Sequence, residues 1–381
     1  MEKRKIALCI TEMNPGGAEK AMMSLATRLD REKFDPVLYV LRPEKYHDPR
    51  SWIPAIREAG IPIVFLDISG PISLVRGILR LKKYLKRQKP DLIQSFLFHA
   101  NLVGRIAGRL AGVPIVCSGI RVSERSSRWQ LLIDRKTQRL ADSYIAVSRS
   151  CAEYTAEQGI DPQKIRIIAN GIDLAENDFP LPGEKNGKNT VSDLIFPSDS
   201  LNFLFVGRFT EQKGLDWLFD TLPFWFEREK IDLWMVGDGP DRQKLTDRAN
   251  QLSCSGRIHF CGWRPDISAL MKKSDLLLLP SRWEGMPNVV LEAMKAALPV
   301  FASNTDGVAE LLGENIEPQS FPFGDKEIFL EKIRILIENP DLRIRLGKEN
   351  QKRISAHFNI FDKVREYEDH WTALCEKEDH R

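Results

Sequence analysis

Short apolar runs alternate with longer stretches of helical periodicity along almost the whole chain. In the first half, the runs that predict strands are Ile6–Thr11, Val37–Leu41, Ile63–Leu66, Leu92–Ser95, Ile115–Ser118, Tyr144–Val147 and Ile165–Ala169. Between them, stretches whose apolar residues recur every three or four positions predict helices, among them Glu19–Leu29, Leu74–Lys89, Leu102–Ala111 and Ser150–Glu157. Continuous apolar strands separated by helices are typical of a parallel sheet covered on both faces.

A second set of the same kind follows a break. Residues 176–200 are rich in Asn, Gly, Pro, Ser and charge, which is typical of a linker or surface loop. Further strands are predicted at Phe203–Gly207, Leu233–Gly237, Ile258–Gly262, Leu276–Pro280 and Val300–Ser303. Three helices follow from Leu330, separated at Asn339-Pro340 and at Asn359. We therefore predict two doubly wound α/β domains, 1–178 and 201–359, joined by a linker over 179–200.

Composition places the chain among soluble globular proteins. It has 381 residues, 43% hydrophobic and 29% charged, and no apolar run approaches the roughly 18 residues that cross a bilayer. The first apolar run, Ile6–Ile10, is too short for a signal peptide, so we expect a cytoplasmic protein. Six scattered cysteines form no Cys-x-x-Cys motif and have no histidine at ligand spacing, which predicts free buried thiols and no metal site.

The formal net charge of +3 conceals two oppositely charged parts. Residues 1–175 carry 29 Lys and Arg against 18 Asp and Glu, a net +11, and the remainder is net −8. The densest basic run, 76–89, has Ile78, Leu79, Leu81 and Leu85 at near-helical spacing, which predicts an amphipathic basic helix. Two interpretations stay open: a solvated outer helix, or a face that binds an anionic membrane surface. Nucleic acid is a poor fit because aromatic residues do not interleave with these cations.

The chemistry is expected where strands end, because ligands of open α/β sheets bind at the carboxyl ends of the strands. After the first strand, Gly16-Gly17 opens a helix and lets backbone amides approach a phosphate, although Gly-Gly turns are also common without a ligand. A later strand ends in Gly207-Arg208, and Lys213 follows five residues on, so two cations flank one turn. The turn Gly237-Asp238-Gly239-Pro240 needs only backbone geometry to explain it.

The segment after Leu276–Pro280 carries two carboxylates. Glu284 lies in a loop, a helix is predicted to begin near Pro287, and Glu292 lies in the second turn of that helix. A carboxylate can accept two hydroxyl donors, as a sugar or ribose diol presents them. Eight residues apart, the two could contact different parts of one extended ligand.

In order and spacing these motifs resemble those of the family-four retaining glycosyltransferases of GT-B fold, over nearly the whole chain. The matching segments are Gly16-Gly17-Ala18-Glu19, 95–101 with His99, Val147-Ser148, Asn170-Gly171-Ile172-Asp173, Val206-Gly207-Arg208 with Lys213-Gly214, Gly237-Asp238-Gly239-Pro240, and the pair Glu284 and Glu292. The resemblance implies two Rossmann-like domains facing a central cleft, the first binding the acceptor and the second the nucleotide sugar. It also implies that the last helix, about 360–381, packs back on the first domain.

The resemblance also implies residue roles. Arg208 and Lys213 would neutralise the donor diphosphate, Glu292 would bind the ribose, Glu284 the sugar hydroxyls, and His99 would lie beside the reacting centre. The implied catalytic residues are His99, Arg208, Lys213 and Glu284, and the implied donor-binding residues are Gly16, Gly17, Arg208, Lys213, Gly237, Pro287, Asn288, Val289 and Glu292. Two segments depart from the family pattern, Met286-Pro287-Asn288 and Asp306-Gly307, and leave the donor sugar open.

The expected reaction is transfer of a hexose or N-acetylhexosamine from a nucleotide-diphosphate sugar, a UDP-sugar first, with no further cofactor. The acceptor would be a glycan or lipid-linked saccharide in cell-surface polysaccharide or lipopolysaccharide biosynthesis, at the cytoplasmic face of the inner membrane. No Asp-x-Asp motif stands at a strand end, so we expect cations in place of a metal. The alternatives are a nucleotide-sugar epimerase or hydrolase of the same fold, and a non-catalytic nucleotide-sugar-binding subunit. A dehydrogenase fits poorly because the dinucleotide fingerprint is missing.

Overall fold

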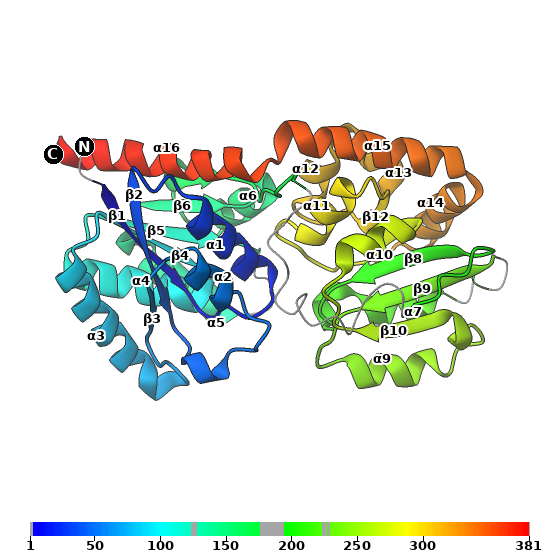
Figure 1. Cartoon of the computed structure of the whole chain (residues 1–381), viewed down its shortest axis with the longest axis horizontal. Helices are drawn as coiled ribbons and strands as arrows, with labels where there is room; N and C mark the ends of the chain where they lie inside the picture. Colours follow the sequence, from blue (N-terminus) through cyan, green and yellow to red (C-terminus); the bar gives the residue numbers. More distant parts are fainter. Residues whose placement is uncertain (1–2, 123–127, 176–193, 223–225, 227–228, 381) are drawn as a thin grey trace. The chain divides into compact units, whose positions relative to one another are not determined.

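The computed structural model describes residues 3–122, 128–175, 194–222, 226 and 229–380, with only the backbone of residues 71, 72 and 128. The chain divides into two compact units, Met1–Gly183 with Ile360–Arg381, and Glu184–Asn359 (Figure 1). Most of the linker predicted over 179–200 falls in 176–193, outside the described residues.

The first unit is built on a parallel sheet of seven strands in the order β3-β2-β1-β4-β5-β6-β7. The strands are β1 Arg4–Ile10, β2 Phe34–Val40, β3 Ile63–Phe65, β4 Leu92–Phe96, β5 Ile115–Ile120, β6 Ser143–Ala146 and β7 Ile165–Ile167. The helices are α1 Gly17–Arg28, α2 Ile53–Glu58, α3 Pro71–Gln88, α4 Phe98–Ala111, α5 Arg128–Thr137, α6 Arg149–Glu157 and α16 Ile360–Asp379. Sequence order reverses between β1 and β4, which is the switch point of a doubly wound sheet.

Helices cover both faces of this sheet, so its strands are apolar on both sides. One core cluster joins β1, β2 and β4 to α1, α2 and α16, through side chains such as Met22, Ile56 and Trp371. A second cluster joins the other face to α3 and α4, through Leu81, Leu85 and Val103. This two-sided burial explains why the strands appear as uninterrupted apolar runs in the sequence.

The second unit is built on a parallel sheet of six strands in the order β10-β9-β8-β11-β12-β13. The strands are β8 Leu201–Val206, β9 Ile231–Val236, β10 Ile258–Gly262, β11 Leu276–Leu279, β12 Val300–Ser303 and β13 Ser320–Phe321. The helices are α7 Leu215–Thr221, α9 Arg242–Ala249, α10 Ile267–Lys273, α11 Asn288–Lys295, α12 Val308–Leu312, α13 Ile316–Gln319, α14 Lys326–Glu338 and α15 Pro340–His357. Here the order reverses between β8 and β11.

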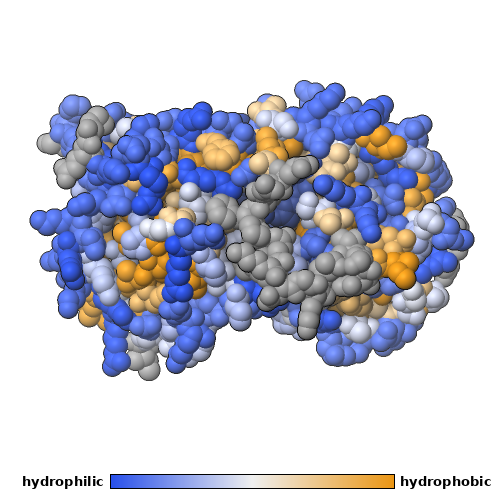
Figure 2. Space-filling view, viewed as in Figure 1, coloured by the Kyte–Doolittle hydropathy of each residue, from blue (hydrophilic) through white to orange (hydrophobic). Residues whose placement is uncertain are grey.

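The prediction of two doubly wound α/β domains is confirmed, with corrections to single elements. The helix α4 begins at Phe98, four residues before the predicted Leu102, so His99 lies in its first turn. The short strand β13 and the helix α5 were not predicted. In α3, Leu81 and Leu85 are buried as an amphipathic helix requires, but Leu79 is 53% exposed. In the space-filling view, hydrophobic residues lie in patches among mainly hydrophilic ones (Figure 2).

The cysteines are free thiols in the structure. Cys9, Cys117, Cys151, Cys254 and Cys375 are buried and Cys261 is half-buried. Burial raises the pKa of Cys9 to about 12, because a thiolate there would have lost its hydration. This thiol therefore behaves as a small apolar side chain.

Candidate functional site

The switch point of the second unit gathers the predicted cationic turn and the predicted carboxylate loop. The neighbouring strands β8 and β11 pair in parallel, so both connections leave the same edge of the sheet. The turn after β8 carries Arg208 and Lys213, and the loop after β11 carries Glu284. Two backbone and side-chain contacts tie them: Arg282 N donates to Gln212 O at 2.7 Å, and Gln212 Nε2 donates to Trp283 O at 2.9 Å.

Lys213 and Glu284 are in direct contact. The ammonium of Lys213 pairs with Glu284 Oε1, and the side chains are only 14% and 8% exposed. Ser281 Oγ donates to the same carboxylate oxygen at 2.7 Å, so the buried charge has two partners. The two residues predicted to bind different parts of a donor are thus paired with each other in the folded chain.

Arg208 presents the remaining cation of this turn. Its side chain is exposed, and no hydrogen-bond or ion-pair partner is found for it among the described residues. The next residue, Phe209, is fully buried, and its N–H donates to Asp238 O at 2.9 Å. A rigid turn therefore holds a guanidinium at the switch point that is available to an anion.

Glycines let the connections at this edge approach one another. Gly237, after β9, has φ +137°, and a Cβ there would lie 1.9 Å from the carbonyl oxygen of Gly207. Gly214 has φ +63°, and a Cβ there would lie 2.1 Å from Pro280 O. The need for glycine at 237, predicted as a donor-binding position, thus already follows from packing against the cationic turn.

The helix α11 begins at the same edge. Pro287 is its N-cap and offers no capping side chain, Asn288 and Val289 form the first turn, and all three follow directly from the Glu284 loop. Glu292 is half-buried in the second turn. The helix is predicted to begin near Pro287, and it begins one residue later. Its amino-terminal end, with its positive dipole, directly follows the loop whose Glu284 pairs with Lys213.

In the first unit, the predicted residues lie after the two strands at that unit's switch point. Gly16 and Gly17 are exposed and open α1, with Gly16 as an extended N-cap. His99 lies in the first turn of α4, after β4. Leu97, the N-cap of α4, has φ +74°, a strained conformation for leucine that sets the direction in which α4 leaves the sheet.

His99 is kept neutral by its surroundings. Desolvation lowers the pKa of His99 below its usual range, and the positive charge of Arg42 lowers it further. The ring packs edge-on against Phe98 with centroids 5.2 Å apart. An imidazole held this way offers one nitrogen donor and one acceptor at neutral pH rather than a charge.

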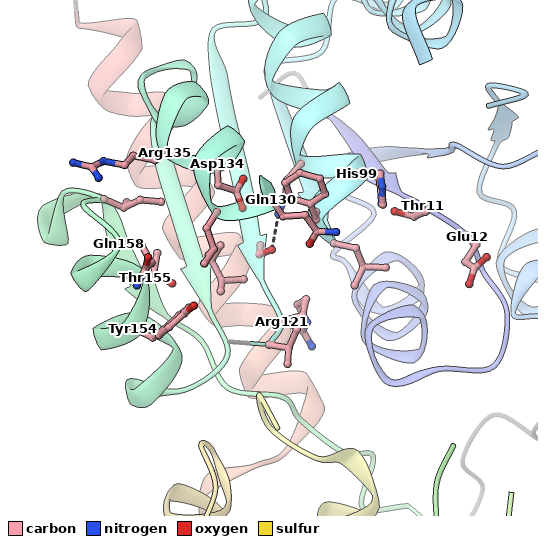
Figure 3. Close-up of a pocket in the computed structure, with 18 residues that line it drawn as sticks. Thr11, Glu12, His99, Arg121, Gln130, Asp134, Arg135, Tyr154, Thr155 and Gln158 are labelled. Carbon is pink, nitrogen blue, oxygen red and sulfur yellow. Dashed lines mark hydrogen bonds between the residues drawn. The ribbon is translucent and has the colours of Figure 1, made fainter. Parts of the chain in front are cut away.

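A pocket of about 310 Å³ lies beside His99 within the first unit. Its lining comes from the residues that follow β1, β4 and β5 and from α5 and α6. In Figure 3 Arg135 and the labelled residues 154, 155 and 158 lie on one side, Thr11, Glu12 and His99 on the other, and Gln130 and Arg121 between them. Its volume is at the lower end of the range for small-molecule sites.

The sequence reading missed Arg121, which follows β5 in this pocket. The Nη2 of Arg121 donates to Asn170 Oδ1, and the guanidinium lies over the ring of Phe96, 4.7 Å from its centroid. Asn170 belongs to the segment 170–173, one of the motifs that resemble the family. At its neighbour Gly171, an added Cβ would lie 2.6 Å from Ile360 Cα, so the backbone there packs closely against the start of α16. A basic residue at the end of a predicted strand was the available signal.

In the part of the chain that is described, no group of three or more His, Cys, Asp or Glu side chains is arranged to hold a metal ion. Among the same residues, no helix has both the length and the hydropathy to cross a bilayer.

Two family models match the chain and together cover most of it. Residues 15–176 match "Glycosyltransferase Family 4", and residues 189–353 match "Glycosyl transferases group 1". The two matches fall on the first and second units.

Individual proteins are similar over nearly the whole length. An Escherichia coli protein described as UDP-Gal:alpha-D-GlcNAc-diphosphoundecaprenol alpha-1,3-galactosyltransferase is 27% identical, over 96% of each chain. A Rhizobium meliloti lipopolysaccharide core biosynthesis glycosyltransferase, LpsE, is 28% identical over 90% of this chain and 92% of its own. Among solved structures, Anabaena Alr3699/HepE in complex with UDP-glucose superposes with a TM-score of 0.80 at 20% identity, covering 97% of this chain and 99% of that one.

Proposed function

Because the chain belongs to the family-four glycosyltransferases of GT-B fold, we propose that it is a retaining transferase that uses a UDP-sugar. The sugar moved would be a hexose or N-acetylhexosamine, and the acceptor a lipid-linked saccharide in cell-surface polysaccharide biosynthesis. Relatives named as lipopolysaccharide and diphosphoundecaprenol glycosyltransferases support this acceptor class. The observation that carries the proposal is the convergence of Arg208, the Lys213–Glu284 pair and α11 at one switch point.

In this proposal the second unit stabilises the departing nucleoside diphosphate. As the bond to the anomeric carbon breaks, negative charge grows on the phosphate oxygen that leaves. The exposed guanidinium of Arg208, the ammonium of Lys213 and the start of α11 would stabilise that charge more in the transition state than in the ground state. These cations would do the work of a metal ion, so the reaction is proposed to need none.

The two carboxylates would bind hydroxyl groups of the donor's two sugar rings. Glu284, already oriented by Lys213 and Ser281, is assigned to hydroxyls of the transferred sugar, and Glu292 to the ribose. In the first unit, neutral His99 is assigned to the transferred sugar, and Gly16-Gly17 to the approach of backbone amides to phosphate. With no carboxylate nucleophile proposed, the acceptor would attack from the face that the diphosphate leaves, which retains the configuration and passes the acceptor's proton to the phosphate.

The same proposal places the enzyme at an anionic membrane surface on the cytoplasmic side, through α3. The helix carries six cations and no acidic residue, with Val75 62% exposed and Leu79 53% exposed. Basic side chains beside exposed apolar ones are typical of helices that lie on anionic lipid.

Replacement of Arg208 by alanine tests the assignment. A thermal-shift screen of nucleotide sugars first identifies a donor, since a bound ligand raises the melting temperature. We expect Arg208→Ala to lower kcat for transfer about 100-fold, because one preorganised charge is lost at the leaving group. Arg345→Ala, an exposed arginine of α15, is the matched control and should leave kcat unchanged.

The outcomes separate the alternatives. A transferase releases UDP only with acceptor present, a hydrolase releases it without acceptor, and a binding subunit releases none. Transfer by Arg208→Ala at the wild-type rate would show that the diphosphate assignment is wrong.

A further inference from the structure

The pocket beside His99 differs in chemistry along its length. At one end lie His99, Thr11 and Glu12, and Arg135, Tyr154, Thr155 and Gln158 lie at the other (Figure 3). Asn101 also lines the pocket. It is 3% exposed and donates through Nδ2 to Gly119 O at 2.9 Å, while its Oδ1 has no hydrogen-bond partner among the described residues. An orphaned amide oxygen at a pocket wall is suited to accept a ligand hydroxyl.

The acids that line this pocket are already neutralised. Glu12 pairs with Arg42, Oε2 to Nε at 3.2 Å, and Asp134 pairs with the fully buried Arg105 at 2.7 Å. Neither of these two cations lines the pocket. The acidic groups therefore add little net negative charge to the pocket.

Arg121, in contrast, has no carboxylate at ion-pair distance in the described part of the chain. Its Nε is buried without a hydrogen-bond partner. Burial lowers the pKa of Arg121, and neighbours such as Tyr367 on α16 and Glu19 on α1 only partly offset this. A half-buried cation with an unused donor makes the pocket favourable to an anion.

An apolar surface adjoins the pocket on α5. Trp129 is 55% exposed and Leu132, one turn later, is 54% exposed, on the same side of the helix. Phe98 packs edge-on against both His99 and Trp129, with ring centroids 5.2 and 5.4 Å apart. Aromatic side chains thus run without a break from the proposed reacting end of the pocket to the exposed apolar face.

We propose that this pocket binds the lipid-linked acceptor by its phosphate, which Arg121 holds, while the adjoining chain of the lipid lies over Trp129 and Leu132. The saccharide then occupies the part of the pocket between Asn101 and His99, with its reactive hydroxyl toward the imidazole. The inference rests on the proposed function and deepens it, because it specifies an acceptor that is both anionic and apolar.

The test uses three probes on the full chain, with UDP at saturation to occupy the donor site of the second unit. Farnesyl diphosphate carries both features, inorganic pyrophosphate the anion alone, and farnesol the apolar chain alone. Isothermal titration calorimetry below the micelle concentration gives the affinities. We expect farnesyl diphosphate to bind at least about tenfold more tightly than either fragment, as one charge-assisted contact contributes that much.

Two variants divide the contributions. Arg121→Lys keeps the charge but loses the Nε donor, and should weaken farnesyl diphosphate and pyrophosphate about tenfold without affecting farnesol. The double variant Trp129→Ser, Leu132→Ser should weaken farnesyl diphosphate and farnesol without affecting pyrophosphate. Tyr46→Ser, which removes a 52% exposed aromatic residue outside the pocket, is the control and should change none of the three.

The binding measurements distinguish failure of the pocket assignment from failure of the proposed transferase function. If the wild-type chain binds UDP but holds farnesyl diphosphate no more tightly than farnesol, the pocket assignment is wrong and the transferase proposal stands. This comparison needs no variant, so it holds even if Arg121→Lys fails to fold. If the chain binds no nucleotide and turns over no nucleotide sugar, the proposed function is wrong, and the three-probe comparison still decides what the pocket binds.

Discussion

At the scale of single residues, Lys213 and Glu284 have a structural role as a buried ion pair and a proposed role in binding the donor. Both are largely buried, and the carboxylate also accepts from Ser281 Oγ. A buried charge is tolerated only when it is paired, so each residue depends on the other before any ligand arrives. An incoming diphosphate would give Lys213 a second anion, while Ser281 keeps Glu284 in position.

Removal of Lys213 alone should therefore destabilise the second unit. We expect Lys213→Met to cost about 3 kcal/mol of unfolding free energy, because Glu284 loses its counter-charge, and Lys213→Met with Glu284→Gln to recover most of it. Urea unfolding followed by tryptophan fluorescence measures both. A single variant as stable as the wild type would mean that the pair does not stabilise the unit.

At the scale of elements, α3 shows how a helix can serve both a core and a surface. Leu81 and Leu85 fill the core against α4, whereas Val75 and Leu79 face outward among the cations. Arg80 pairs with Asp67, so part of the positive charge is balanced within the unit. Lys82, Lys83 and Lys86 have no ion-pair partner among the described residues, which leaves them available to an anionic surface.

Charge removal on α3 should abolish lipid binding. The triple variant Lys82→Gln, Lys83→Gln, Lys86→Gln is expected to bind anionic vesicles at least tenfold more weakly, since each cation near such a surface contributes about 1 kcal/mol. Co-sedimentation with anionic and neutral vesicles measures it. Lys244→Gln, Lys348→Gln, Lys352→Gln, on exposed helices of the second unit, is the control. Equal binding of wild type to both vesicle types would contradict the membrane proposal.

At the scale of the whole molecule, the chain ends on the unit where it began. The last helix, α16, belongs to the first unit: Trp371 is fully buried in its core, and Arg4 pairs with Asp379 at 2.6 Å. His370 Nε2 lies 2.8 Å from Ser143 Oγ, which ties α16 to β6. Desolvation, then the charges of Arg166 and Lys377, lowers the pKa of His370 to about 4.

This contact makes the attachment of α16 sensitive to acid. The unfolded chain binds a proton at His370 near its ordinary pKa of 6.5, and the folded chain only near 4. The contribution of neutral His370 to the free energy of unfolding is therefore complete above about pH 6.5. It is lost as the pH falls toward 4, by up to about 3 kcal/mol. His370→Gln keeps a hydrogen-bonding group but cannot take up a proton. Between pH 7 and 4.5, the variant should therefore lose less unfolding free energy than the wild type, as measured by urea unfolding. An identical loss in both proteins would refute this.

Most of the fold could be predicted from the sequence because strands and helices leave local patterns of apolar residues and helix-breaking residues. Two-sided burial made the strands continuous apolar runs, and Asn339-Pro340 and Asn359 separated the three last helices at the residues where α14, α15 and α16 end or begin. The two residues of β13 were too few to show a pattern. The start of α4 was misplaced because positive φ at Leu97, an unusual residue for it, turns the chain earlier than its periodicity indicates.

Residue types and spacing by themselves determined the two sheets, the strand ends at which we predicted the site residues, and the family. Only the tertiary structure decided which of those residues meet. It paired Lys213 with Glu284, made Gly237 a packing requirement of the cationic turn, and left the half-buried Arg121 without an ion-pair partner among the described residues. The physical reason is that a charge's partner and its burial depend on residues distant in sequence, here 71 positions apart for the ion pair, which no local pattern records.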